Sequence, residues 1–317
     1  MNTNTIKIFV VALFLLLTGM NKLVAYDFVS DRLYYNILSE EDRTVEVTYE
    51  KEDEFGDVHS SYSGNIEIPR KVVYRSKTYS VTCIGMKAFQ ECSGLTSVTI
   101  PNSVTSITYR AFWYCSSLTS VTIPNSVTSI TFNTFANCSR LENITVDPGN
   151  ANYSSIDGIL YNKDATSLIC CPGAKTTVTI PNSVTSIGRE AFYGCSSLTS
   201  VMIPNSVTSI GQYAFSGCSG LTSVTIPNSV TSIEYGALSG CSKLETIYVQ
   251  SQVPIECDPR FPNNIIKDAV LYVPTGTLAA YEKVDPWRNF WNIEEMDFVS
   301  SVEETATNEK EAEISVE

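Results

Sequence analysis

The chain has 317 residues, and its 34 acidic and 21 basic residues give a formal net charge of −13 at pH 7. This acidic balance argues against a nucleic-acid partner, because binding to phosphate backbones needs a basic surface. The sequence contains one histidine and no recognisable catalytic, cofactor-binding or metal-binding motif, so we expect neither enzymatic activity nor a bound cofactor.

Residues 1–25 have the pattern of a secretory signal peptide. Lys7 precedes an apolar run at 8–17, and Ala25 supplies a small residue for cleavage. An uncleaved anchor is the alternative. The sequence has no second long apolar run, so we expect the chain after cleavage not to be an integral membrane protein. The remaining 26–317 would carry a net charge of −15, because the signal contains two lysines and no acids.

Residues 26–71 lack the repeats that follow and are predicted to form an N-terminal β cap. The segments 33–37 and 44–49 alternate apolar and polar residues, as half-buried strands do. The histidine, His59, lies in an acidic stretch and is interpreted as a solvated loop residue, although a Ser-His-Asp arrangement would have to use it.

The segment 72–243 is dominated by an internal repeat. The octapeptide IPNSVTSI occurs at 100–107, 123–130, 180–187, 203–210 and 226–233, and each copy belongs to a 23-residue unit. A fixed period of this length is typical of a solenoid, in which each unit buries its apolar face against its neighbours. The sequence therefore predicts a repeat solenoid of stacked units.

One unit predicts short strands and a short helical turn. In the unit 95–117, Val98 and Ile100 are spaced by two and indicate a strand, which Pro101 ends. Residues 104–107 indicate a second short strand, and the spacing within 111–115 favours one helical turn.

The unit at 141–174 is 34 residues long and carries an insertion. Its Asp157-Gly158 pair and the Asn-Lys-Asp run at 162–164 predict a small hairpin projecting from one edge. The segment 147–152 is interpreted as a turn, and weak calcium binding is the alternative.

Six of the ten cysteines occupy one repeat position and are predicted to form a column of buried thiols, with disulfides as the alternative. They are Cys92, Cys115, Cys138, Cys195, Cys218 and Cys241. The states of Cys83, Cys170, Cys171 and Cys257 stay open.

Beyond the repeats, 244–298 is predicted to form a mixed C-terminal cap. The spacing within 275–284 favours a helix that ends before Pro286 and Trp287. The segment 299–317 is acidic, lacks apolar periodicity and is predicted to be disordered.

The pattern Leu-x-x-Val-x-Ile-Pro-x-x-Val-x-x-Ile-x-x-x-Ala-Phe-x-x-Cys-x-x-Leu closely resembles the BspA-like class of leucine-rich repeats over roughly 65–298. The resemblance implies a leucine-rich-repeat solenoid in a secreted or surface protein of a host-associated bacterium. Some members of the class are adhesins for matrix proteins, and the class supplies no catalytic motif.

The repeats differ from one another mainly after the second Ile and after the Phe. Aromatic residues gather there, and these bury a large area at low entropic cost when they bind. The candidate binding residues are Tyr109, Trp113, Tyr114, Phe132, Tyr193, Tyr213 and Tyr235. The alternatives are neutral drift on an exposed turn and a rival surface along the strands, where a threonine column runs from Thr99 to Thr225 with Met202 interrupting it.

We therefore expect a secreted or cell-surface interaction module that binds an extracellular or host protein of the matrix type. The alternative is a glycan-binding protein that uses the exposed aromatics. Because the repeats are nearly uncharged, the sequence predicts contacts made of aromatic area and hydroxyl hydrogen bonds, with weak dependence on salt.

Overall fold

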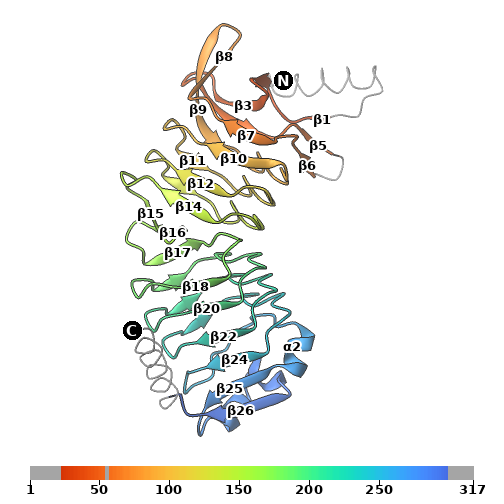
Figure 1. The fold of residues 1–317 in the computed structure, drawn as a ribbon, viewed down its shortest axis with the longest axis vertical. Coiled ribbons are helices and arrows are strands. Elements are labelled where there is room, and N and C mark those ends of the chain that lie inside the picture. The colour runs from red at the N-terminus through yellow and green to blue at the C-terminus, as the bar shows by residue number, and fades with distance from the viewer. Residues whose placement is uncertain (1–22, 54–56, 299–317) are drawn as a thin grey trace, which may run out of the picture.

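The computed structural model describes residues 23–53 and 57–298 and shows an elongated stack of turns (Figure 1). The predicted acidic tail at 299–317 and most of the predicted signal peptide lie outside these residues. Residues 23–25 of the latter are described, and Leu23 and Val24 pair with Glu52 and Lys51.

The N-terminal end is a small β cap, as predicted. Strands β3 and β4 contain the two alternating segments, and the buried Tyr35, Val45 and Val47 are inaccessible to solvent. Because β4 pairs in parallel with β9, the sheet of the cap continues into the solenoid. The strands of the cap are β1 (Leu23–Val24), β2 (Phe28–Ser30), β3 (Leu33–Ser39), β4 (Thr44–Thr48), β5 (Lys51–Glu52) and β6 (Val58–His59).

Two rows of parallel strands form the two sheet faces of the stack. In the first row, the strands form four parallel sheets, β7 with β10, β12 with β14, β18 with β20, and β22 with β24, β25 and β26; Val121 lies opposite Ile144, for example. This row begins at β7, inside the segment expected to be cap, and ends at the last strand of the C-terminal cap. Its strands are β7 (Gly64–Glu67), β10 (Leu95–Thr99), β12 (Ser120–Ile123), β14 (Asn143–Val146), β18 (Thr177–Thr179), β20 (Ser200–Met202), β22 (Ser223–Ile226), β24 (Thr246–Val249), β25 (Val270–Pro274) and β26 (Asn292–Met296).

The second row contains the Ser-Ile pairs that end each octapeptide, together with strands of the first repeat and of the long unit. The octapeptide recurs because its residues bond to the previous unit: the Thr128 hydroxyl donates to the Thr105 carbonyl at 3.3 Å and the Ser126 hydroxyl to the Val104 carbonyl at 2.6 Å. The strands are β8 (Lys71–Tyr74), which pairs antiparallel with β9, then β9 (Lys77–Ile84), β11 (Ser106–Ile107), β13 (Ser129–Ile130), β17 (Ser167–Cys170), β19 (Ser186–Ile187), β21 (Ser209–Ile210) and β23 (Ser232–Ile233).

The segment predicted to be a helical turn is a pair of tight turns with bonds from residue i+3 to residue i. Trp113 donates to the Arg110 carbonyl and Cys115 to the Phe112 carbonyl. Arg110 and Tyr114 have φ of 56° and 59°, and these left-handed residues prevent a continuous α-helix. These turns stack on one another and form a third side of the solenoid, besides the two sheet faces. We call this side the turn edge.

The interior of the turn edge is a stack of aromatic rings and thiols. Phe89, Phe112 and Phe135 stack with centroids 5.0 and 5.3 Å apart, and all three are buried. The predicted thiol column is confirmed, because its six cysteines are buried and unpaired. All ten cysteines of the chain are free thiols.

The long unit divides the core of the stack into two clusters. Strands β15 (Tyr153–Ile156) and β16 (Ile159–Asn162) form the predicted hairpin, and Asp157 and Gly158 take the positive φ that its turn requires. The expected projection from an edge is wrong, because Ile159, Leu160 and Tyr161 are buried. Leu160 packs in the N-terminal cluster, and its neighbours Ile159 and Tyr161 pack in the C-terminal one.

The segment 147–152 is the turn that the sequence predicted. Buried Asn150 holds it, because its side-chain nitrogen donates to the carbonyls of Pro124 and Val127 at 2.8 and 3.0 Å. The C-terminal cap is mixed, as predicted, and its aromatic core includes Phe261 and Trp287. It contains the helices α2 (Asn263–Asp268) and α3 (Leu278–Tyr281) and the 3-10 helix η1 (Trp287–Asn289).

Candidate functional site

Side chains on the outside of the turn edge form a surface that we call the aromatic–arginine row. Tyr114, Phe132 and Tyr235 are between 42 and 46% exposed, and the remaining aromatic members are half-buried. The row consists of Tyr109, Arg110, Trp113, Tyr114, Phe132, Arg189, Tyr213, Tyr235 and Arg260.

Arg110 is the centre of the first part of the row. Its guanidinium carbon lies 5.0 Å from the ring centroid of Tyr109 and 4.7 Å from that of Trp113. The edge of Tyr114 packs against Trp113 with centroids 4.3 Å apart. Tyr109 also meets Phe132 of the next unit, at 5.2 Å, so the contacts continue along the stack. A guanidinium between two ring faces is held by cation–π attraction.

The row crosses the long unit by a single cation–π contact. The long unit contributes no pair of turns of its own. Cys171 occupies the position of the repeated Phe, because its backbone amide donates to the Ala191 carbonyl at 2.7 Å, as the amide of Phe192 does to the Ala214 carbonyl. Arg189 bridges the resulting break, with its guanidinium carbon 4.4 Å from the ring centroid of Phe132.

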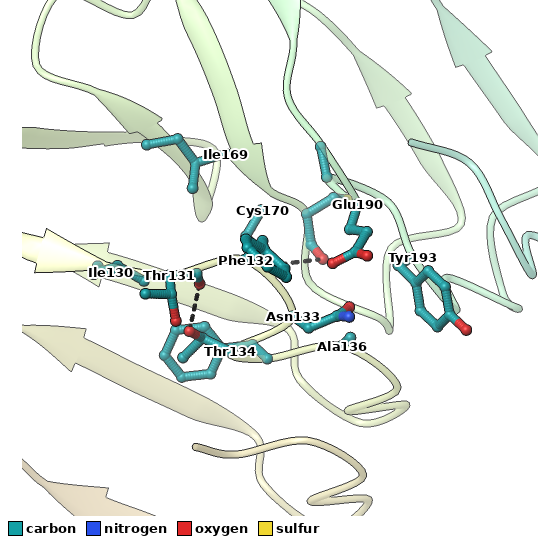
Figure 2. Close-up of a pocket in the computed structure, with 13 residues that line it drawn as sticks. Ile130, Thr131, Phe132, Asn133, Thr134, Ala136, Ile169, Cys170, Glu190 and Tyr193 are labelled. Carbon is teal, nitrogen blue, oxygen red and sulfur yellow. Dashed lines mark hydrogen bonds between the residues drawn. The ribbon is translucent and has the colours of Figure 1, made fainter. Parts of the chain in front are cut away.

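Below this contact lies a small pocket with buried polar groups (Figure 2). Asn133 and Glu190 point into it, and each has one side-chain oxygen without a hydrogen-bond partner. Burial raises the pKa of Glu190, against the opposing effect of Arg189 and Arg110. The enclosed volume is about 10 Å³, which is close to the minimum for a single water molecule, so this is not a pocket for an organic ligand.

The second part of the row lies on the C-terminal half of the stack. Tyr213 and Tyr235 meet edge to face with centroids 5.5 Å apart. Arg260 stacks on Tyr235 at 4.8 Å and pairs with Asp258 at 3.0 Å, where both charged side chains are more than half exposed.

The structure brings together most of the residues that the sequence singled out. Tyr109, Trp113, Tyr114 and Phe132 form one connected group, and Tyr213 and Tyr235 form another. Tyr193 lines the small pocket and belongs to neither group.

The sequence-based candidates did not include Arg110, Arg189 and Arg260, which stack on these aromatics, or Asn133 and Glu190 of the small pocket. A signal for one of them exists: Arg110 and Arg140 are the only charged residues between positions 95 and 140.

The rival surface on the first sheet face is an open hollow of about 680 Å³. Met202 is 63% exposed at its centre, flanked by Thr179 and Thr225 on the neighbouring strands. Tyr248 and Tyr272 stack beyond it with centroids 5.2 Å apart. All residues that line this hollow are uncharged.

His59 lies at the end of β6 rather than in a loop. Its Nε2 is 3.1 Å from Asp53 Oδ2, and both side chains are more than one third exposed. Within the described ranges, no group of His, Cys, Asp and Glu side chains is arranged to hold a metal ion.

The geometry defines a β-solenoid that presents extended surfaces, with no enclosed cavity at either candidate site large enough for a substrate. A family model described as a BspA type leucine-rich repeat region with six copies matches residues 71–171 and 170–271. The chain therefore belongs to the BspA-type leucine-rich repeat family. Broadly, such bacterial repeat proteins are protein-interaction modules and are typically found at the cell surface or secreted.

Several solved structures are similar in fold. A leucine-rich repeat protein from Eubacterium ventriosum shares 24% identity over 78% of each chain, with a TM-score of 0.47. One from Bacteroides ovatus shares 23% identity over 86% of this chain and 77% of that chain, with a TM-score of 0.45. A leucine-rich cell surface protein from Faecalibacterium prausnitzii shares 22% identity over 86% of this chain and 95% of that chain, with a TM-score of 0.44. No curated protein matches the chain.

Proposed function

We propose that the chain is a secreted or cell-surface adhesion module that binds a protein of the host or of another cell through the aromatic–arginine row. The observation that carries this proposal is the connected cluster of Trp113, Tyr114 and Arg110 on an exposed turn edge. Tryptophan, tyrosine and arginine are the residue types that dominate binding energy at protein interfaces.

The fold does not require these residues, which supports a binding role. The corresponding turns of other units carry Gln90 and Ser216 where this unit has Trp113, and Glu91 and Gly217 where it has Tyr114. The interior positions, by contrast, repeat their Phe and Cys. Side chains that are dispensable for stacking are therefore available for contact with a partner.

A glycan ligand has less support from the same geometry. Sugar rings pack on open aromatic faces, but Arg110 covers one face of Tyr109 and one of Trp113, and Arg189 covers one face of Phe132. Among the described residues, no helix is long and apolar enough to cross a membrane. Export and surface location remain part of the proposal and rest on the residues 1–25 and the family.

The experiment is capture of proteins from host secretions on the immobilised protein, in parallel with two variants. The row variant carries Tyr109→Ala, Trp113→Ala and Tyr114→Ala, and the strand-face variant carries Thr179→Ala, Met202→Ala and Thr225→Ala. We expect a host protein that binds the wild type and the strand-face variant and is lost from the row variant. Equal capture by all three, or loss only from the strand-face variant, would contradict the proposal.

A further inference from the structure

The arginines of the row differ in how they are neutralised. The side chain of Arg110 forms no hydrogen bond and no ion pair with another described residue, and its buried Nε has no partner. The indole N–H of Trp113 beside it also lacks a partner. A guanidinium carries five N–H donors in a fixed fork, so stacking between two rings orients Arg110 without using those donors.

Arg189 and Arg260 also stack on aromatic rings, but each of them lies beside a carboxylate. The Nε of Arg189 lies 3.4 Å from the buried carboxylate of Glu190, and the Arg189 side chain is 46% exposed. Arg260 pairs with Asp258 on the surface, and surface pairs contribute little and exchange readily. Both guanidinium groups therefore keep donors that face solvent.

We propose that the aromatic–arginine row binds an acidic polypeptide segment that lies along the turn edge. This inference rests on the proposed function and names the chemistry of its partner. Carboxylates of the segment would accept hydrogen bonds from Arg110, Arg189 and Arg260, and the aliphatic parts of its side chains would contact the edges of the aromatic rings.

Charge complementarity selects this partner. The protein is acidic as a whole, yet the row carries three arginines that lie several stacked turns apart, and one extended chain that runs along the turn edge would meet them in succession. Paired guanidinium and carboxylate groups form strong charge-assisted hydrogen bonds. The covered ring faces favour a peptide over a sugar polymer. If the partner is acidic, its affinity should depend strongly on salt, in contrast to the weak salt dependence expected from the nearly uncharged repeats.

The test uses the full-length protein and a fluorescein-labelled poly-L-glutamate oligomer, with binding followed by fluorescence anisotropy. The arginine variant, with R110Q, R189Q and R260Q, should bind more than tenfold more weakly, because hydrogen bonds to charged groups contribute about 1.5–3 kcal/mol each. The matched control R140Q, K175Q and K243Q removes the same charge from residues next to β14, β18 and β24 and should bind like the wild type. Thermal unfolding confirms that both variants fold. Affinity for the wild type should fall as salt rises from about 0.1 to 1 M.

Three outcomes would overturn the inference: no binding of poly-L-glutamate by the wild type, an equal loss in the control variant, or row-dependent binding of heparin in preference to poly-L-glutamate. The variant R110K, R189K and R260K should bind with intermediate strength, because lysine keeps the charge but loses the planar fork. If poly-L-glutamate fails to bind while a captured host protein still requires Trp113 and Tyr114, the acidic segment is rejected and the proposed function stands.

Discussion

The thiol of Cys115 donates a hydrogen bond to the backbone carbonyl of Phe89 in the preceding unit, with sulfur and oxygen 3.0 Å apart. Cys138 makes the same bond to Phe112 at 3.0 Å, and Cys241 makes it to Phe215 at 3.1 Å. The repeated cysteine therefore joins neighbouring turns as a buried donor, in addition to filling space. A disulfide would remove these donors.

We predict that the repeat cysteines are reduced and unreactive in the folded protein. Burial raises the pKa of Cys92 and of Cys241 to about 12, so almost no thiolate is present at neutral pH. Thiol titration without reductant should find almost no reactive repeat cysteine under native conditions and most of the six in denaturant. Fewer than two free thiols among the six would reject the column.

Phe112→Ala should destabilise the middle of the stack. The ring of Phe112 is fully buried between Phe89 and Phe135, and loss of such a ring costs roughly 3–5 kcal/mol. Because the stability of a solenoid is approximately a sum over neighbouring units, hydrogen exchange should rise first across 95–140. Tyr109→Ala on the outside of the same unit is the control, and unchanged protection in Phe112→Ala would be incompatible with the register.

Tyr114→Gly and Tyr114→Val should separate backbone strain from side-chain packing. Tyr114 has φ of 59°, a conformation that costs an L-residue roughly 1–2 kcal/mol and glycine little. We expect Tyr114→Gly to change the free energy of unfolding by less than about 1 kcal/mol, whereas the β-branched Tyr114→Val is clearly destabilising. Equal denaturation midpoints for the two variants would show that the left-handed turn is not required there.

Glu190→Gln should remove a pH dependence of stability. Burial raises the pKa of Glu190 above its ordinary value of 4.5, while Arg189 and Arg110 lower it. The folded state therefore favours the neutral acid, so its contribution is complete below the unfolded pKa and is lost as the pH rises through the folded pKa. Glutamine resembles the neutral acid, and the variant should be more stable than the wild type at neutral pH.

The measurement is the difference in unfolding free energy between wild type and Glu190→Gln from pH 4 upwards. The difference should grow with pH and then level off. The pKa of Glu46 is also raised, mainly by burial, but this residue is common to both proteins and cancels in the difference. A constant difference across the range would refute the assignment.

Most of the fold could be predicted from the repeats, because each recurring position indicates the same buried or exposed environment in several units. Val98, Phe112 and Cys115 were placed correctly in the core from their spacing alone. The long unit was harder, because a single copy offers no pattern. Leu160 packs in one core cluster and Tyr161 in the other. The local sequence indicates a hairpin but does not show where that hairpin packs.

The candidate site was predictable only in part. Variation among the repeats identified Trp113 and Phe132, but it could not show which charged residues would lie on their rings. Arg189 reaches Phe132 only because the long unit contributes no pair of turns, so units far apart in sequence become neighbours on the turn edge. Such a contact depends on three-dimensional stacking and has no local sequence signal.

The most direct test of the row as the binding surface is oxidative footprinting of the protein with and without its captured partner. Trp113, Tyr114, Tyr235 and Met202 are accessible side chains with readily oxidised groups, and they report separately on the turn edge and on the first sheet face. We predict that the partner protects Trp113, Tyr114 and Tyr235 and leaves Met202 unchanged. Protection of Met202 with no change at the three aromatic residues would contradict the account and move the site to the strands.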